Sequence, residues 1–200
     1  PMHIPDGFID IPTSAAFAAI AAGAVALSLK GAKSSLDDKT APLAGLTATF
    51  IFAVQMLNFP VAAGTSGHLL GAALATVLVG PYAATLALTI VLLLQALLFA
   101  DGGLSALGLS AFNMSIVAVW VSYAIFFTLK KILPKTKSST AAAAGIAALI
   151  SVPAAAASFV LQYAIGANAT FSVSAVLAAM IGTHVLIGIG EALITLFAVG

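Results

Sequence analysis

Apolar runs of membrane-spanning length follow one another along almost the whole chain. Seven can be distinguished, at residues 13–29, 41–59, 66–80, 82–100, 107–129, 139–165 and 172–199. One helical crossing of a bilayer needs about 20 apolar residues, so a chain of 200 residues has no room left for a soluble domain. Hydrophobic residues make up 62% and charged residues 6%, against about 45–50% and about 25% in soluble domains. The sequence therefore predicts an all-α polytopic membrane helical bundle with about seven transmembrane helices.

The basic residues are all lysines and lie in two short segments, 30–39 and 130–137. Such residues collect in the cytoplasmic loops of membrane proteins. The apolar stretch from Leu69 to Ala100 would run about 48 Å as one straight helix, and Gly80-Pro81 near its middle offers a turn. Counting two crossings there places both lysine segments on one side. We therefore expect seven spans, with the N-terminus outside and the C-terminus inside. Segment 66–80 is short for a full crossing, so the alternative that it forms a re-entrant or protein-buried helix stays open.

Several functional classes lack the residues that they need. Cysteine is absent, which excludes disulfides and thiolate metal sites. The phosphate loop Gly-x-x-x-x-Gly-Lys-[Ser/Thr] is missing, so the chain does not bind ATP in that way. An intramembrane metalloenzyme is disfavoured, because Glu191 is the single glutamate and the His-Glu-x-x-His motif is absent. We expect no enzyme and, at a net charge of +1, no nucleic-acid partner. Acidic Asp6 and Asp10 precede the first apolar run where a signal peptide is basic, so we expect that run to be retained.

Three polar segments, at residues 2–8, 64–71 and 95–103, meet on the external face of this topology. His3 lies next to the N-terminus, where a terminal amine, an amide nitrogen and the imidazole can close fused chelate rings in one plane. Planar nitrogen ligation suits Ni(II) or Cu(II), and His68 can supply a fourth nitrogen. Simpler interpretations stay open: a solvated terminus for His3, a hydrogen-bonded structural histidine for His68, and a capping or turn residue for Asp101.

His184 and Glu191 lie seven residues apart and share a face of the last expected helix. Ionisable groups inside a membrane are candidates for function, since they cost about 2.5–3.5 kcal/mol on insertion scales. A mutual buried hydrogen bond explains the pair equally well. Their role stays open at this point.

Three motifs together resemble the substrate-binding S component of nickel/cobalt energy-coupling-factor transporters, the NikM/CbiM family. They are Met2-His3-Ile4-Pro5-Asp6-Gly7-Phe8, Gly64-Thr65-Ser66-Gly67-His68-Leu69-Leu70-Gly71 and Phe112-Asn113-Met114. The resemblance spans essentially the whole chain. It implies a single transmembrane S-component domain over residues 1–200, with an external metal-binding loop at 1–12 that plugs the bundle. Carried over to this sequence, the metal ligands are the amine of Met2, the backbone nitrogen and imidazole of His3, and the imidazole of His68.

The chain departs from this family pattern at Pro1, which precedes the methionine at which family members begin. Met2 then has an amide nitrogen in place of a terminal amine, and an amide nitrogen binds metal only after deprotonation. The proline amine, the Met2 and His3 amides and the His3 imidazole form an alternative set of four nitrogens. We expect Pro1 to weaken or reshape the site, and its deletion to restore binding that depends on both His3 and His68.

The resemblance implies a capture subunit that binds Ni(II) or Co(II) as transported substrate in the inner (plasma) membrane. Its implied partners are a transmembrane coupling subunit and cytoplasmic ATPase subunits, with room for a small accessory membrane subunit. The alternative is a self-sufficient carrier or channel for divalent metal ions that uses His184 and Glu191.

Overall fold

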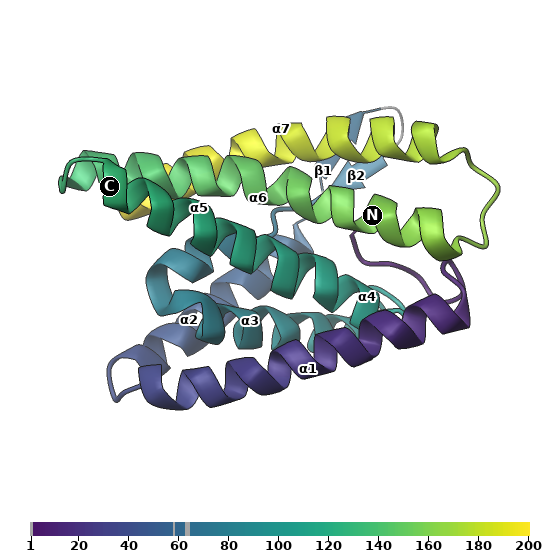
Figure 1. Ribbon diagram of the computed structural model, residues 1–200, viewed down its shortest axis with the longest axis horizontal. Helices are drawn as coiled ribbons and strands as arrows, with labels where there is room; N and C mark the ends of the chain where they lie inside the picture. Colours follow the sequence, from purple (N-terminus) through teal and green to yellow (C-terminus); the bar gives the residue numbers. More distant parts are fainter. Residues whose placement is uncertain (1, 58, 63–64) are drawn as a thin grey trace.

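The protein is a bundle of long helices that run side by side along its long axis (Figure 1). The computed structural model describes residues 2–57, 59–62 and 65–200. Its elements are α1 (Ile11–Ser35), α2 (Thr40–Met56), β1 (Phe59–Ala62), β2 (Thr65–Gly67), α3 (Ala72–Phe99), α4 (Leu107–Ala111), the π-helix η1 (Phe112–Val117), α5 (Ala118–Ile132), α6 (Lys137–Gly166) and α7 (Val173–Val199). Strands β1 and β2 form a small antiparallel hairpin that the all-α prediction did not include.

Five helical segments in the described part of the chain are long and apolar enough to cross a membrane. They are α1, α3, the continuous stretch Leu107–Ile132, α6 and α7. Helix α2 is apolar but shorter, at 17 residues. Large hydrophobic side chains such as Leu27, Leu98 and Phe197 are exposed on the outer surface, as expected for helices that face lipid rather than water. The chain is an integral membrane protein, and the count of seven complete crossings stays a prediction.

Helix α3 folds back on itself at Gly80-Pro81. Gly80 has φ 80° and ψ 166°, outside the helical region, and the ring of Pro81 cannot continue the preceding turn. A straight helix of 28 residues would separate its ends by about 42 Å. Instead, His3 contacts both His68, which precedes α3, and Asp101, which follows it. The reversal lies where the sequence predicted a turn, and it brings the two ends of α3 to the same end of the bundle.

The segment expected as a helix over 66–80 is helical only from Ala72 onward. Residues 65–67 belong to β2 and residues 68–71 are extended or irregular. Gly71 adopts a left-handed conformation with φ 77°, which a residue with a side chain adopts only at a cost. An added Cβ there would also lie 2.9 Å from Cγ1 of Ile51. The first half of α3 is thus a short helix of eight residues behind an extended strand, too short to cross a bilayer alone.

Three helix starts follow directly from local sequence. The side chain of Asp10 accepts a hydrogen bond from the Thr13 N–H at the start of α1. Thr136 and Ser172 cap α6 and α7 in the same manner. Such caps satisfy backbone donors that have no partner within the helix. They fix where the helices enter the bundle, at both of its ends.

Helices α6 and α7 approach closely because small residues face the contact. A Cβ added to Gly145 of α6 would lie 3.2 Å from the carbonyl oxygen of Ala192, and one added to Gly188 of α7 would lie 3.1 Å from that of Leu149. Small residues let helix backbones pack tightly in membranes. This contact fixes the position of α7, which carries both His184 and Glu191.

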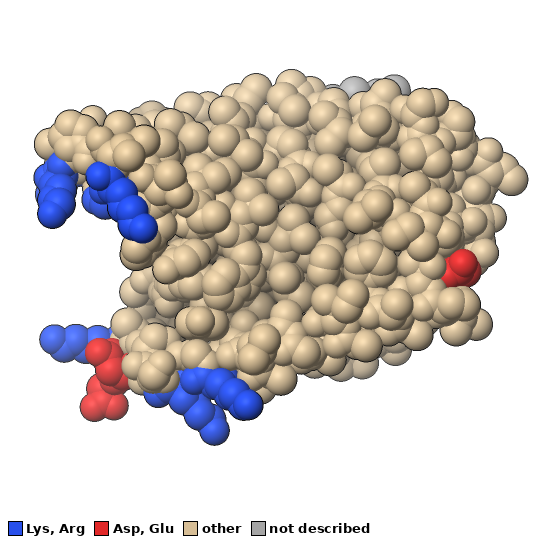
Figure 2. All heavy atoms as spheres, in the orientation of Figure 1, with Lys and Arg blue, Asp and Glu red and all other residues tan. Residues whose placement is uncertain are grey.

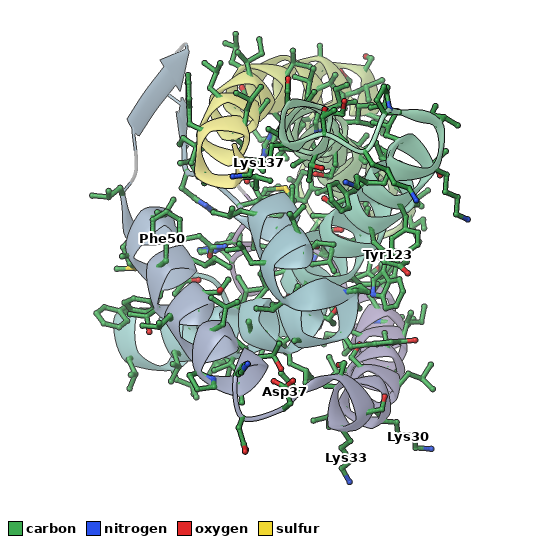
Figure 3. The ribbon with its side chains drawn as sticks, turned by 90° about the vertical axis from the view of Figure 1, so that its left-hand side faces the viewer. Lys30, Lys33, Asp37, Phe50, Tyr123 and Lys137 are labelled. Carbon is green, nitrogen blue, oxygen red and sulfur yellow. The ribbon has the colours of Figure 1, made fainter. Side chains whose placement is uncertain are left out.

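Both lysine segments lie at one end of the bundle (Figure 2). Figure 3 is viewed from that end and labels Lys30, Lys33 and Lys137. The N-terminal segment lies at the other end, where the Asp10 N–H donates to the Gly166 carbonyl oxygen at 2.7 Å. The structure therefore places the two basic segments together, as the positive-inside argument requires.

Cysteines introduced singly at Ser34, Ser138 and Thr170 test the orientation, because the chain has no cysteine of its own and all three positions are exposed. Thr170 belongs to the α6–α7 loop at the N-terminal end. We expect an impermeant thiol reagent to label Thr170→Cys in intact cells, and to label Ser34→Cys and Ser138→Cys only after permeabilisation. The reverse labelling pattern would show that the lysine segments face outward.

Candidate functional site

The N-terminal segment, residues 2–10, enters the bundle, with its first three residues and Ile9 buried and residues 5–7 exposed. Met2, Ile4 and Ile9 are 2%, 0% and 3% exposed and belong to the hydrophobic core. The Ile4 N–H donates to Oγ of Ser110 at 3.1 Å, and the Gly103 N–H donates to the Ile4 carbonyl oxygen at 2.8 Å. Both polar groups of the Ile4 backbone are therefore satisfied inside the bundle, as a buried loop requires.

The loop between α3 and α4 holds this segment through Asp6. Its carboxylate accepts hydrogen bonds from the Ser105 N–H at 2.8 Å and from the Ser105 hydroxyl. These bonds lower the pKa of Asp6, which keeps the carboxylate ionised near neutral pH. Gly103 lies directly against Asp6, since an added Cβ would come within 2.3 Å of the Asp6 backbone nitrogen. A residue without a side chain is needed for this approach.

The loop between α6 and α7 holds the other side of the segment. Asn168 donates its backbone N–H to the Phe8 carbonyl oxygen at 3.0 Å and its side-chain amide to that of Gly7 at 2.9 Å. Ile9 pairs with Ala167 in an isolated antiparallel bridge. The Phe8 ring packs 5.7 Å from that of Tyr163. Two loops that lie far apart in sequence therefore fix the backbone on which His3 is carried.

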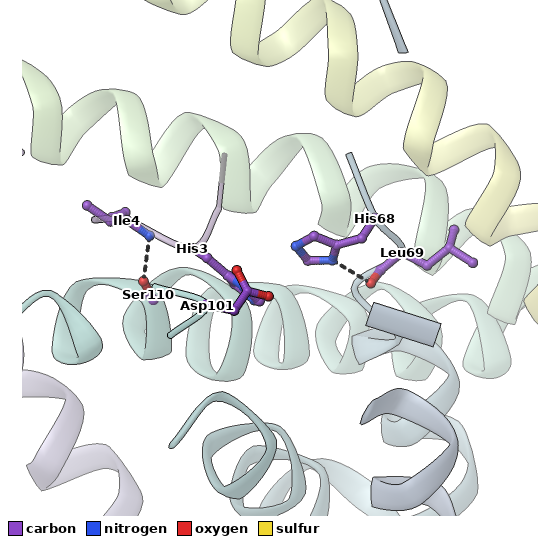
Figure 4. Close-up of polar contacts among 6 residues, drawn as sticks. All are labelled: His3, Ile4, His68, Leu69, Asp101 and Ser110. Carbon is purple, nitrogen blue, oxygen red and sulfur yellow. Dashed lines mark hydrogen bonds and ion pairs between the residues drawn. The ribbon is translucent and has the colours of Figure 1, made fainter. Parts of the chain in front are cut away.

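His3 lies between His68 and Asp101 (Figure 4). Its ring centroid is 4.7 Å from that of His68, and its Nδ1 is 2.8 Å from Oδ1 of Asp101. His3 is 7% exposed. Among the described residues neither ring nitrogen of His3 has a hydrogen-bond partner of normal geometry, so the contact with Asp101 is electrostatic. In the part of the chain that the structure describes, Nδ1 of His3 therefore contacts Asp101, and its Nε2 has no partner.

Asp101 follows the end of α3, where its backbone N–H donates to the Gln95 carbonyl oxygen at 3.1 Å, as the capping or turn residue suggested by the sequence would. Its side chain contacts His3, and this contact lowers the pKa of the carboxyl. The carboxylate therefore stays ionised near neutral pH. It supplies a negative charge next to two imidazoles, an arrangement that favours a bound cation.

His68 is 9% exposed and is oriented by its own backbone. Its Nδ1 lies 2.9 Å from the Leu69 carbonyl oxygen, and because a carbonyl only accepts, Nδ1 carries the proton. The lone pair is then on Nε2, on the side of the ring that Figure 4 shows turned toward His3. Burial, together with the neighbouring His3, lowers the pKa of His68 to about 4. A neutral imidazole is the form that ligates metals.

The described residues do not contain a group of three or more His, Cys, Asp or Glu side chains with the spacing of a metal site. His3 and His68 therefore form a metal site only together with nitrogens from the backbone of the N-terminal segment. Met2 directly precedes His3 in this segment, and its side chain is buried. Two residues named in the sequence predictions lie outside the described residues: Pro1, which was expected to weaken or reshape the site, and Gly64, which begins the second family motif.

His184 and Glu191 do not bond to each other. His184 Nδ1 lies 2.7 Å from the Met180 carbonyl oxygen, within its own helix. The Glu191 carboxylate accepts the N–H groups of Leu70 and Gly71 at 3.0 Å and 2.7 Å. The mutual hydrogen bond considered from the sequence is therefore wrong, because each side chain has a different partner.

Asn113, part of the third motif, holds η1 against α6. Its side-chain amide donates to Gln162 Oε1 at 2.8 Å, and its Oδ1 accepts from the Ser158 hydroxyl at 2.7 Å. π-Helical segments are rare and are frequently found at functional sites. This network fixes the helix start that carries Ser110, the partner of Ile4. Sequence reasoning missed Ser110, and it singled out the segments of Asp6 and Gly103 without their partners, since nothing in the local sequence reveals a partner about 100 residues away.

The comparisons with known proteins agree with the resemblance seen in the sequence. The family model of CbiM, described as the cobalt uptake substrate-specific transmembrane region, matches residues 3–200. A protein of Haloquadratum walsbyi assigned to metal transport is 39% identical over 196 residues, which cover 97% of this chain and 86% of the relative. A protein of Archaeoglobus fulgidus assigned as a fused nickel transport protein, NikMN, is 37% identical over 194 residues, covering 97% of this chain and 63% of the relative.

The fold is also found among solved structures. A crystal structure of a transition metal transporter superimposes with a TM-score of 0.88 at 30% sequence identity, covering 98% of this chain and 90% of that one. The matched family is one of transport proteins and not of enzymes. The family match over almost the whole length, the relatives and the shared fold lead to one conclusion: the chain belongs to the CbiM family of substrate-specific transmembrane proteins of nickel and cobalt transport.

Proposed function

We propose that this chain captures Ni(II) or Co(II) for an ATP-driven uptake transporter of the energy-coupling-factor type. The observation that carries the proposal is the convergence of His3 and His68, with ring centroids 4.7 Å apart, at a site closed by the inserted N-terminal segment. Relatives assigned to nickel transport and the cobalt-uptake description of the family support the choice of metal.

The proposed ligands are nitrogens of Met2, His3 and His68. An imidazole closes a chelate ring with its own backbone nitrogen only through Nδ1, because Nε2 lies on the far side of the ring. In the structure Nδ1 of His3 faces Asp101. Metal binding therefore replaces this contact by a metal–nitrogen bond, while Nε2 of His68 approaches as a further ligand. A planar set of nitrogens suits Ni(II), and the Asp101 carboxylate offsets part of the charge of the ion.

The remaining parts of the transporter come from other chains in this proposal. The sequence has no phosphate loop of the Gly-x-x-x-x-Gly-Lys-[Ser/Thr] type, so cytoplasmic ATPase subunits bind the nucleotide. A transmembrane coupling subunit links them to this chain, with a small accessory membrane subunit as a further component. The complex lies in the inner (plasma) membrane, with the N-terminal segment outside and the lysine segments in the cytoplasm.

The decisive experiment compares binding with transport for the purified chain from which Pro1 has been deleted, so that Met2 carries the terminal amine. Titration with Ni(II) in detergent is expected to give one tight site per chain, since the ligands come from a single bundle. Liposomes that contain this chain alone are expected to take up no more Ni(II) than empty liposomes, because no energy source is coupled to it.

Two results would contradict the proposal. Absence of a tight Ni(II) and Co(II) site would remove the capture function. Metal uptake by the chain alone would instead favour the self-sufficient carrier with His184 and Glu191 on the ion path. That alternative gains nothing from the structure, because both oxygens of Glu191 are taken up by backbone N–H groups.

A further inference from the structure

Glu191 is the single glutamate of the chain and lies in the middle of α7 with 3% of its surface exposed. Its Oε2 accepts the Leu70 N–H at 3.0 Å and its Oε1 accepts the Gly71 N–H at 2.7 Å. A buried ionisable residue in a membrane helix is costly and therefore points to a role. The starts of α1, α6 and α7 are capped by the local residues Asp10, Thr136 and Ser172. The backbone just before α3 is held instead by Glu191, a residue 120 positions away from Gly71.

Glu191 binds the N–H groups of two peptide units, and the carbonyl groups of the same two units also accept hydrogen bonds from side chains. The first unit contains the Leu69 carbonyl and the Leu70 N–H, which point in opposite directions across a trans peptide. The carbonyl accepts Nδ1 of His68 at 2.9 Å, while the N–H donates to Glu191. The second unit contains the Leu70 carbonyl, which accepts Nε2 of Gln55 at 2.8 Å, and the Gly71 N–H, which donates to Glu191.

The ring of His68 is therefore connected to Glu191 through one rigid peptide plane. If the Leu70 N–H lost its partner, the plane would be free to rotate, and the Leu69 carbonyl would turn away from His68 Nδ1. That carbonyl keeps the proton on Nδ1 and the lone pair on Nε2. In metal sites, partners of this kind set the tautomer and direction of a histidine ligand.

We propose that Glu191 is a positioning residue for the metal site: through the Leu69–Leu70 peptide it holds His68 with Nε2 directed toward His3. This inference rests on the proposed function, because it takes His68 to be a metal ligand. It gives the buried carboxylate a task that requires neither an ion path nor contact with the metal. Gln55 on α2 supports the same turn from the other side, so helices α2 and α7 together hold the segment that carries His68.

The first test is the substitution Glu191→Gln. An amide keeps only one accepting oxygen and turns an NH₂ group toward a backbone N–H, so one of the two bonds is lost. We expect the Kd for Ni(II) to rise by about 10- to 100-fold, the range found for partners of metal-ligating residues. The control is Thr195→Val, a substitution of similar shape one turn further along α7 at a position 1% exposed, which is expected to bind Ni(II) like the unmodified chain.

A double-mutant cycle shows whether Glu191 acts through His68. In a His68→Ala background the Glu191→Gln substitution is expected to have no further effect on the Kd. An equal rise in Kd in both backgrounds would mean that Glu191 supports the fold in general, and the inference would be wrong.

A second measurement needs no metal and therefore separates this inference from the proposed function. Nitrogen-15 NMR of the metal-free protein is expected to show His68 protonated at Nδ1, and Glu191→Gln is expected to produce a mixture of the two tautomers. Should Glu191→Gln fold poorly, Gln55→Met releases the other side of the turn and is expected to shift the tautomer in the same direction. An unchanged His68 signal in both variants would overturn the role given to Glu191, even if the protein binds Ni(II) as proposed.

Discussion

His68→Ala is expected to reduce the affinity for Ni(II) by about 100- to 1,000-fold while the bundle stays folded. Four-ligand structural zinc sites in small peptides contribute about 10–16 kcal/mol, and on that scale one ligand of four accounts for roughly 2.5–4 kcal/mol. Within the described part of the chain the ring hydrogen-bonds to the adjacent Leu69 carbonyl and not to another helix, so its loss changes few contacts between helices. Titration calorimetry gives the affinity, and the thermal unfolding temperature shows whether the fold survives.

The matched control is His184→Ala, which removes another buried histidine from the same protein. His184 is 4% exposed and contacts the Met180 carbonyl oxygen of its own helix. We expect its removal to change the Ni(II) affinity by no more than a few fold. If a folded His68→Ala protein binds Ni(II) as tightly as the unmodified chain, His68 is structural and the proposed ligand set is wrong.

Gly103→Ala is expected to displace the N-terminal segment and with it His3. The added methyl group would come within 2.3 Å of the Asp6 nitrogen, and the Gly103 N–H also binds the Ile4 carbonyl at 2.8 Å. Forcing extra atoms into packed positions costs about 1–3 kcal/mol, which corresponds to roughly a 5- to 150-fold loss of Ni(II) affinity if the segment moves. Both the affinity and the unfolding temperature should fall, although no proposed ligand has changed.

Gly45→Ala serves as the control, because a Cβ at this position in α2 would meet nothing within 4 Å. Alanine is favoured over glycine inside a helix by about 1 kcal/mol, so this variant should bind Ni(II) normally and unfold at the same or a higher temperature. Undiminished affinity in Gly103→Ala would show that the N-terminal segment is not needed in its present position for binding.

Features encoded within windows of about 20 residues could be predicted from the amino-acid sequence. Apolar runs located the five long membrane helices, since hydropathy acts on each segment separately; the count of seven spans stays a prediction. Gly80-Pro81 marked the reversal in α3, because no other dipeptide in that stretch breaks a helix so strongly. The two lysine segments were correctly expected at one end of the bundle. An even number of crossings between two loops places both loops on the same side of the membrane. The family motifs around His3 and His68 were also visible in the sequence.

The pairing of the polar residues, in contrast, depends on how the helices pack and could not be predicted from local sequence. Glu191 and His184 share a helix face, yet Glu191 binds Leu70 and Gly71 at a distance of 121 and 120 residues in sequence. Asp101 has the surroundings of a turn residue but contacts His3. The extended segment before α3 replaced the start of an expected helix. A buried polar group must find a partner wherever packing places one, and which helices pack together is a property of the whole bundle rather than of any local stretch.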